Sequence, residues 1–275
     1  MSEAQDILGI IAGNRSLPFE LARGARAAGV RRLVAVAFEG ETDPAFASLV
    51  DRIEWLRVGQ LDRMIRFFAD EGVRRCVMVG QLAPKNLFDL RPDLRAMKLL
   101  FRLKEKHAHS IFGGIAQELA ADGITLIEAT PWLRALMPEP GFAMGKALTE
   151  DQEADVAYGF RIAKEVSRLE IGQTVVVKNG AVLAVEGFEG TDRCLTRGGE
   201  LAGKKRGAVA VKVSKQQHDM RFDIPCVGRT TLEVCGSAGI QVLAFEAGKT
   251  LLLDQSELPD VLRRSKLSLV AGRCS

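Results

Sequence analysis

The chain has 275 residues, of which 47% are hydrophobic and 27% charged, so it holds enough apolar material for one large or two ordinary domains. A net charge of +3 is too small to indicate a nucleic-acid-binding protein. The five cysteines are scattered and form no CxxC pair, which predicts a reduced, cytosolic protein without a disulfide framework or a structural zinc site. No apolar run approaches the length of a membrane span, and acidic residues before the first run argue against a signal peptide.

Residues 1–133 alternate between strand and helix patterns. Buried strands are predicted for DILGIIAG, RRLVAVAF, RRCVMVG and TLIEAT, and helices for LPFELARGARAAGV, VGQLDRMIRFFADEGV and FGGIAQELAADGI. Strands that are apolar throughout and alternate with helices indicate a parallel sheet covered on both faces, so we expect a Rossmann-like domain. Its ligand side would be the carboxyl ends of the strands, where the sequence places Gly13, Asn14, Gly80 and Gln81.

A basic segment with bulky apolar residues, residues 82–110, interrupts this alternation. It carries two sets of residues at helical spacing, the apolar Leu94, Met97, Leu100 and Phe101 and the basic Arg91, Arg95, Lys98 and Arg102. We interpret it as an amphipathic surface helix with a solvated basic face. Contact of that face with anionic lipid or phosphate is the alternative interpretation.

The second half of the chain has a different pattern. The Pro- and Gly-rich LMPEPGFAMG marks a boundary, and residues 134–164 are assigned to a linker and a connecting helix, whose N-cap is predicted at Thr149 with Gln152 or Glu153 nearby. Residues 165–275 are predicted to form a mixed α+β catalytic domain. Two strands joined by Asn179-Gly180 are predicted for QTVVVKNGAVLAVEGF. Further strands are predicted for GAVAVKVSK and QVLAFEAGKTLLLD, and a helix for TTLEVCGSAG.

Three polar clusters of the second half could carry chemistry. The first is VEGFEGTDR, which holds Glu186, Glu189, Thr191, Asp192 and Arg193. The second is Lys212, on a strand of small apolar residues. The third is KQQHDMRFDIPCVG. If this segment is an extended strand, one of its faces carries Gln217, Asp219, Arg221 and Asp223. Each cluster also has a structural interpretation: a helix N-cap, a solvent-facing residue of an edge strand, and the wet side of an antiparallel sheet.

Together the clusters favour chemistry at phosphorus. Two carboxylates about 7 Å apart on one strand face can share a divalent cation, and magnesium usually takes one or two carboxylates plus phosphate oxygens. An arginine between them can bind a phosphate in a bidentate manner, and a lysine adds positive charge. Such a set can neutralise a phosphate, activate water and stabilise a leaving oxygen. GxGxxG, P-loop and GxSxG motifs are absent from the sequence.

Several segments resemble the LpxI-type UDP-2,3-diacylglucosamine pyrophosphatases: GIIAGNRSLP, VGQLDRMIRFF, VMVGQ, LFDLRPDLRAMKLL, AVEGFEGTD and QHDMRFDIPCVG. The resemblance runs from Leu8 to about Gly272 and implies a Rossmann-like N-terminal domain, a linker and a C-terminal domain of the family's own type. It also implies cleavage of UDP-2,3-diacylglucosamine to 2,3-diacylglucosamine 1-phosphate (lipid X) and UMP in lipid A synthesis. The family's cofactor is a divalent metal, usually Mg²⁺, and water is expected to attack the β-phosphorus.

The resemblance and the residue patterns lead to one set of expected site residues. Catalytic roles are expected for Lys212, Asp219, Arg221 and Asp223, with Asp223 as the best candidate for an essential carboxylate. Metal ligation is expected from Asp192, Asp219 and Asp223. Substrate binding is expected from Gly13, Asn14, Gly80, Gln81, Thr191, Asp192 and Gln217.

The expected partners are UDP-2,3-diacylglucosamine, lipid X and the cytoplasmic face of the inner membrane, bound peripherally, with no nucleic acid and with a homodimer left open. Two alternatives remain. A non-catalytic carrier or sensor of a nucleotide sugar or lipid would bind its ligand tightly and be indifferent to a chelator. A dinucleotide-dependent oxidoreductase would rest on fold analogy alone, and the missing glycine fingerprint disfavours it.

Overall fold

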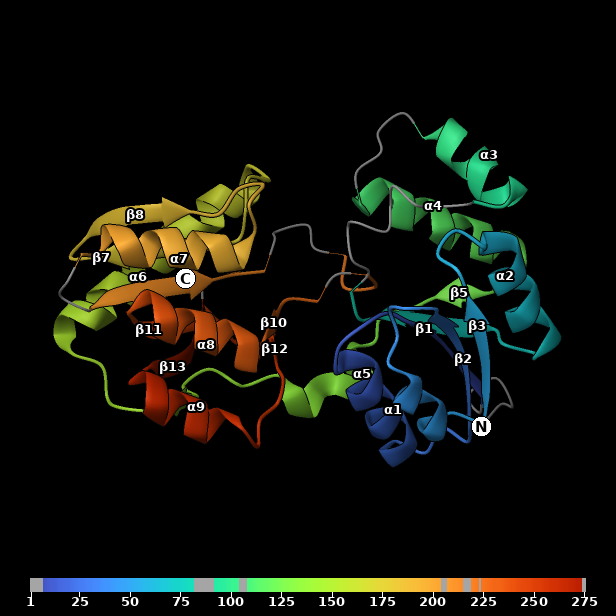
Figure 1. Ribbon diagram of the computed structural model, residues 1–275, viewed down its shortest axis with the longest axis horizontal. Helices are drawn as coiled ribbons and strands as arrows, with labels where there is room; N and C mark the ends of the chain where they lie inside the picture. Colours follow the sequence, from blue (N-terminus) through green and yellow to red (C-terminus); the bar gives the residue numbers. More distant parts are fainter. Residues whose placement is uncertain are drawn as a thin grey trace. The chain divides into compact units, whose positions relative to one another are not determined.

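The computed structural model (Figure 1) describes residues 7–81, 92–103, 108–203, 207–214, 219–222 and 224–273. The chain divides into two compact units, each with its own sheet. Unit 1 comprises residues 1–133 with residues 220–223, and unit 2 comprises residues 134–219 with residues 224–275. The expected α/β organisation, a parallel sheet followed by a mixed sheet with helices, is confirmed. None of the helices in the described ranges combines the length and apolarity that a bilayer crossing requires.

Unit 1 is built on a five-stranded parallel sheet with the order β3-β2-β1-β4-β5. Its strands are β1 (Ile7–Ala12), β2 (Arg32–Phe38), β3 (Arg52–Leu56), β4 (Arg75–Val79) and β5 (Thr125–Leu126). The chain moves outward from β1 to β3 and returns to β4 on the other side of β1. The strand order therefore reverses between β1 and β4, where ligands bind in open α/β sheets.

The helices of unit 1 cover both faces of this sheet. They are α1 (Leu17–Ala27), the 3₁₀ helix η2 (Pro44–Leu49), α2 (Leu61–Asp70), α3 (Leu94–Arg102), α4 (Ala108–Ala121) and α5 (Thr130–Leu133). Val34, Val36 and Phe38 of β2 share one apolar cluster with α2, α3 and α4. Figure 1 shows α1 and α5 on the opposite side of the sheet from α3 and α4. Side chains alternate along a strand, so each strand supplies both cores.

Helix α3 forms where a helix was predicted, but its buried face is not the predicted one. The buried residues are Ala96 and Leu99, whereas Leu94 is 72% exposed and Phe101 83% exposed. The expected solvated basic face is wrong for Arg95, which is 21% exposed and forms ion pairs with Glu118 and Asp122 beyond the helix, whereas Arg102 pairs with Glu118 but stays solvated. In this orientation of α3, Arg95 faces the carboxylates and two large apolar side chains face outward.

Unit 2 contains a six-stranded mixed sheet with the order β6-β13-β11-β9-β7-β8 and a two-stranded sheet β10-β12. The strands are β6 (Ala143–Met144), β7 (Thr174–Lys178), β8 (Ala181–Val185), β9 (Ala208–Lys212), β10 (Cys226–Val227), β11 (Ile240–Glu246), β12 (Leu251–Leu252) and β13 (Ser268–Gly272). Its 3₁₀ helix η4 spans Arg134–Leu136 and its α-helices are α6 (Glu150–Arg168), α7 (Thr191–Leu201), α8 (Arg229–Ala238) and α9 (Leu258–Ser265). Strands β9, β11 and β13 are parallel, and β7 runs antiparallel to β9.

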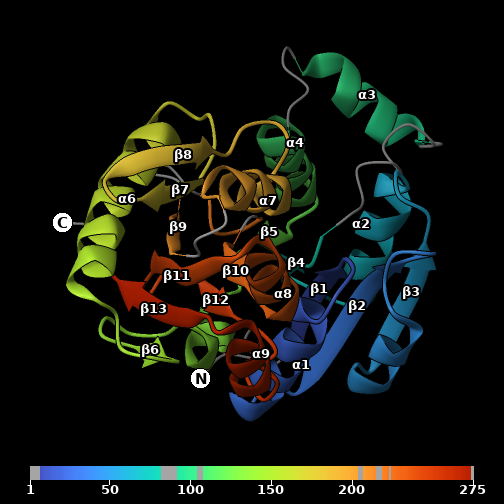
Figure 2. The same ribbon diagram turned by 60° about the vertical axis from the view of Figure 1, so that its left-hand side comes forward.

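Alternation along the strands of unit 2 separates two cores. Val175 and Val177 of β7 pack in one cluster with Phe160 of α6, whereas Val176 joins the cluster of α7, α8 and α9. Figure 2 shows α6 on one side of the sheet and these three helices on the other. Residues 134–164 group with unit 2, because α6 packs along β7 and β9.

Two local predictions about unit 2 are confirmed. Thr149 caps α6 through a capping box with Gln152. Asn179 and Gly180 join β7 to β8 with positive φ angles of 51° and 73°, as a tight hairpin turn requires. The turn is also fixed from α6, since the buried Asp155 carboxylate accepts hydrogen bonds from the backbone N–H groups of Asn179 (2.8 Å) and Gly180 (2.7 Å).

Candidate functional site

Lys212 lies at the carboxyl end of β9, in the middle of the unit 2 sheet. Because β9 is flanked by β11 and β7, the interpretation as a solvent-facing residue of an edge strand is wrong. The residue is 8% exposed, and its Nζ donates a hydrogen bond to the backbone oxygen of Cys226 at 3.2 Å. Because a lysine is rarely buried without an anionic partner, this amine is a candidate for binding an anionic ligand.

Polar side-chain contacts run from Thr174, the strand neighbour of Lys212, to the start of α7. Thr174 of β7 lies opposite Lys212 in the strand register, and its Oγ1 is 3.5 Å from the Oγ1 of Thr191. The Thr191 hydroxyl donates to Oε1 of the buried Glu186 at 3.0 Å. Gly190, the N-cap of α7, has no side chain with which to cap the helix.

Two helices begin at the same edge of this sheet. Helix α7 leads into β9 and α8 leads into β11, so each runs antiparallel to its strand and starts near the strand's carboxyl end. Burial and the charge of Asp192 raise the pKa of the Cys235 thiol in α8 to about 12, although the charge of Lys212 acts to lower it. Asp192 lies in the first turn of α7 and Lys212 is the last residue of β9, so both belong to this edge of the sheet. Helix N-termini with a nearby lysine form a site that favours phosphate groups.

A buried ion pair stabilises this edge from the other face. Glu246 ends β11 and is 4% exposed, and its Oε2 accepts hydrogen bonds from Nζ of Lys164 (2.6 Å) and from the backbone N–H of Ser214 (2.9 Å). Nζ of Lys249 lies 2.9 Å from the other carboxylate oxygen. Burial raises the pKa of Glu246, but these hydrogen bonds outweigh it and hold the pKa below its ordinary value. No local pattern in the sequence indicates this network, because its members are far apart in the chain.

In the third predicted cluster, the described residues 219–222 do not have the predicted extended conformation. Residues 220–222 form a turn instead of an extended strand, with Asp219 just before it. The Arg221 guanidinium lies over the ring of its neighbour Phe222, with 5.2 Å from its carbon to the ring centroid, and the Phe222 ring stacks on Phe112 at 5.9 Å. Phe222 thus packs on the apolar cluster of unit 1, which breaks the alternation of faces. Gln217 and Asp223 lie outside the described residues.

Two predicted carboxylates differ in their availability to a cation. In the described part of the chain, no three His, Cys, Asp or Glu side chains gather in a way that could hold a metal ion. Asp192 is exposed in the first turn of α7, whereas Glu186 is buried and accepts a hydrogen bond from Thr191. Magnesium usually takes only one or two carboxylates when substrate phosphates supply further oxygens, and the exposed carboxylate of Asp192 suits that ion.

The four predicted residues of unit 1 meet at the switch point of its sheet. An isolated bridge pairs Asn14 with Gln81, and the Asn14 N–H donates to the Gln81 oxygen at 2.8 Å. Gly13 donates its N–H to the oxygen of Val79 at 2.8 Å. A Cβ on Gly13 would lie 2.8 Å from the Gln81 oxygen and from the Gly80 carbonyl carbon, so only glycine fits this approach of two chains.

The Asn14 side chain contacts Glu41, which lies in the loop after β2 and was not among the predicted site residues. Nδ2 of Asn14 donates a hydrogen bond to Oε2 of Glu41 at 3.0 Å. Oδ1 of Asn14 is buried and accepts no hydrogen bond from any residue in the described ranges. A buried acceptor without a donor is costly, which favours a bound hydroxyl, amine or water at this place. The signal available in the sequence was an acidic residue just after a buried strand.

Comparisons with known proteins agree with this architecture. The family model described as the LpxI N-terminal domain matches residues 7–136, and that of the LpxI C-terminal domain matches residues 139–270. The UDP-2,3-diacylglucosamine pyrophosphatase LpxI of Caulobacter vibrioides is 30% identical over 260 residues, which cover 90% of this chain and 91% of that protein.

A solved structure, the biotin carboxylase domain of 2-oxoglutarate carboxylase from Hydrogenobacter thermophilus, is 16% identical with a TM-score of 0.27. The match covers 72% of this chain and 41% of that one. The two family models and the Caulobacter relative together span nearly all of the sequence, so this chain belongs to the LpxI family.

Proposed function

We propose that this chain hydrolyses the pyrophosphate of UDP-2,3-diacylglucosamine to lipid X and UMP, a step of lipid A synthesis. Membership in the LpxI family and the activity in the name of the Caulobacter relative support the substrate. The observation that carries the chemistry is the buried amine of Lys212, at an edge of the sheet where α7 and α8 begin and where Asp192 lies in the first turn of α7. This edge combines positive charge for phosphate oxygens with a carboxylate for a cation.

Several residues suit parts of the proposed reaction. Water attacks the β-phosphorus and releases a proton to solvent. As the bond between the water oxygen and this phosphorus forms, the bond from the β-phosphorus to the bridging oxygen breaks, and its electron pair leaves with UMP. Lys212 and the N-terminus of α7 offset negative charge on the phosphate oxygens, and Arg221 is assigned to the same task. Glu186 holds the Thr191 hydroxyl in a fixed orientation beside them.

Magnesium is the proposed cofactor, and Asp192, Asp219 and Asp223 are its proposed ligands. When bound, the ion supplies further neutralisation of the phosphate charge. Asp223 is also the proposed essential carboxylate.

The reaction is tested by single-turnover hydrolysis of UDP-2,3-diacylglucosamine in ¹⁸O-labelled water, with magnesium or with EDTA. We expect metal-dependent formation of lipid X with the label in its phosphate. Label in UMP would retain the reaction and refute attack on the β-phosphorus. If neither condition gave products although the substrate bound, the carrier interpretation would replace this one.

The proposed role of Asp223 is tested by Asp223→Ala, with Asp260→Ala as the matched control. Asp260 is an exposed carboxylate of α9 that pairs with Arg263 on the same helix. We expect the first variant to lose turnover while keeping its melting temperature and substrate binding, and the control to keep turnover. Equal turnover in both variants would refute the assignment.

Peripheral association with the cytoplasmic face of the inner membrane is part of the proposal, because the substrate is a lipid. Leu94 and Phe101 are seven residues apart on α3, so both project from one face, with Lys98 between them. Two exposed apolar side chains around a lysine suit the boundary between lipid headgroups and acyl chains. Because Arg95 and Arg102 are paired with carboxylates, apolar contact rather than charge is expected to carry this association.

A further inference from the structure

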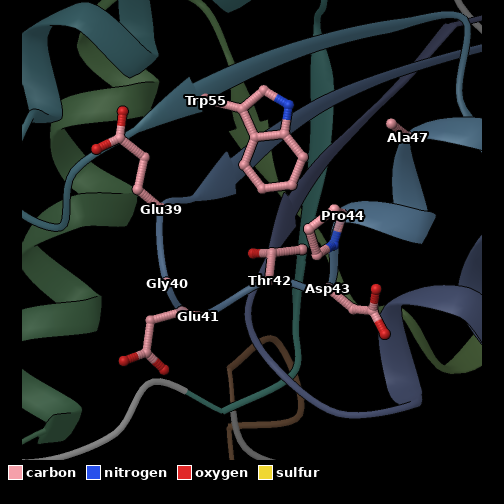
Figure 3. A pocket seen from close by; sticks show the side chains of 8 residues that line it. All are labelled: Glu39, Gly40, Glu41, Thr42, Asp43, Pro44, Ala47 and Trp55. Carbon is pink, nitrogen blue, oxygen red and sulfur yellow. The ribbon is translucent and has the colours of Figure 1, made fainter.

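Unit 1 has a pocket that none of the roles above uses. It is an open pocket of about 720 Å³ beside the carboxyl end of β2. It is lined by Glu39, Gly40, Glu41, Thr42, Asp43, Pro44, Ala47 and Trp55. Figure 3 shows the Trp55 indole, from β3, above the loop that carries Thr42 and Pro44, with Glu39 and Glu41 together on one side. The lining thus offers one large aromatic surface and several carboxylates.

This combination suits a ribonucleoside. The flat, half-buried indole of Trp55 can stack on a base. Glu39 is the first residue after β2, and its carboxylate is exposed, with Oε2 at 3.5 Å from Nε of Arg57. A carboxylate has two acceptor oxygens, which match the two hydroxyl donors of a ribose. The carboxylates of this pocket repel a phosphate, so they favour the uncharged part of a nucleotide.

The pocket adjoins the switch point of the sheet. The Thr42 hydroxyl donates to the backbone oxygen of Ala12 at 2.6 Å, which fixes the pocket loop to the end of β1. Glu41, which lines the pocket, accepts the hydrogen bond from Asn14. The buried Oδ1 of Asn14, which has no donor among the described residues, therefore lies beside the same loop. Nucleotides bind at this place in open α/β sheets, outside the carboxyl ends of the strands.

We propose that this pocket binds the ribonucleoside end of the substrate, with Trp55 against the base and Glu39 accepting hydrogen bonds from the ribose hydroxyls. The identity of the nucleoside as uridine rests on the proposed function. Recognition of the ribose predicts discrimination between UMP and its 2′-deoxy analogue dUMP, because dUMP offers Glu39 one hydroxyl fewer.

The test is a titration with UMP and with dUMP, followed by tryptophan fluorescence. The chain has two tryptophans, so Trp132→Phe leaves Trp55 as the reporter. We expect UMP to change the Trp55 emission and to bind roughly tenfold more tightly than dUMP, the scale of a hydrogen bond to a charged group. Glu39→Ala in this background should bring the affinity ratio to about one.

Glu54→Ala is the matched control. Glu54 is the neighbour of Trp55 on β3 and pairs with Arg63, but it does not line the pocket, so the affinity ratio should stay unchanged. Equal affinities for UMP and dUMP in the unsubstituted pocket, no change in emission at saturating UMP, or a ratio unaffected by Glu39→Ala would overturn the inference.

Hydrolysis of UDP-2,3-diacylglucosamine, measured in parallel, separates this inference from the proposed function. Product formation without ribose discrimination would refute the pocket and leave the reaction intact. Ribose discrimination without products would refute the reaction and leave the pocket as a ribonucleotide site.

Discussion

Replacing Glu246 by glutamine is expected to destabilise unit 2 strongly. The carboxylate is buried and holds three partners from separate parts of the unit, the amines of Lys164 and Lys249 and the backbone N–H of Ser214. Glutamine keeps an oxygen acceptor but removes the charge, which leaves the largely buried amine of Lys164 without a counter-charge. Breaking a buried ion pair from one side costs about 3–5 kcal/mol.

The pH dependence of stability should change in the same variant. Because the pKa of Glu246 is lower in the folded chain than in the unfolded one, the folded state holds its proton less tightly. Its contribution to stability is therefore complete above the unfolded pKa and is lost as the pH falls through the folded pKa. The free energy of unfolding of the unsubstituted protein should fall more steeply in acid than that of Glu246→Gln.

Urea unfolding at neutral and acidic pH measures both effects. Glu165→Gln is the control, because Glu165 is an exposed carboxylate that pairs with Arg168 along the same helix, and such pairs contribute about 1 kcal/mol or less. If Glu246→Gln cost no more than this control at neutral pH, or if the two variants lost stability in parallel on acidification, the assigned role of the network would be refuted.

Three further predictions follow from the site and the surface. Lys212→Met should lower the single-turnover rate by about 100-fold or more, since it removes a charge that stabilises the transition state, and a change below about tenfold would contradict its role. Gly13→Ala should lower the melting temperature and weaken UMP binding, because its methyl group would meet backbone atoms at 2.8 Å, whereas Gly113→Ala, on α4 with open space around it, should do neither. The double variant Leu94→Ser/Phe101→Ser should bind less to lipid vesicles in sedimentation while melting at an unchanged temperature; unchanged vesicle binding would rule out α3 as the contact.

The sequence predicted those elements whose signals are local. The hairpin at Asn179-Gly180, the cap at Thr149 and the apolar strands β1, β2 and β4 each depend on a few neighbouring residues. Strand β3 was not predicted, because its sequence RIEWL mixes charged and apolar residues at the edge of the sheet. Helix α9 and strand β13 near the end of the chain were not predicted either.

Local patterns failed where distant residues decide the outcome. Whether Lys212 lies on an edge strand or in the middle depends on strand pairing across the whole of unit 2. The turn at residues 220–222 follows from the packing of Phe222 on Phe112, more than a hundred positions earlier. The orientation of α3 places Arg95 against carboxylates on and after α4, which lie more than twenty positions away in the chain. No periodicity within one segment contains such information.

The hairpin turn between β7 and β8 has a consequence for the chemical ageing of the protein. An Asn-Gly dipeptide in a flexible chain is prone to deamidation, in which the backbone nitrogen of the glycine attacks the side-chain amide of the asparagine. Here that nitrogen, in Gly180, donates its hydrogen to the Asp155 carboxylate, and both residues of the turn are held in fixed conformations. The folded chain therefore protects Asn179 from a reaction that its own sequence invites, and long storage would damage this turn chiefly through molecules that have unfolded.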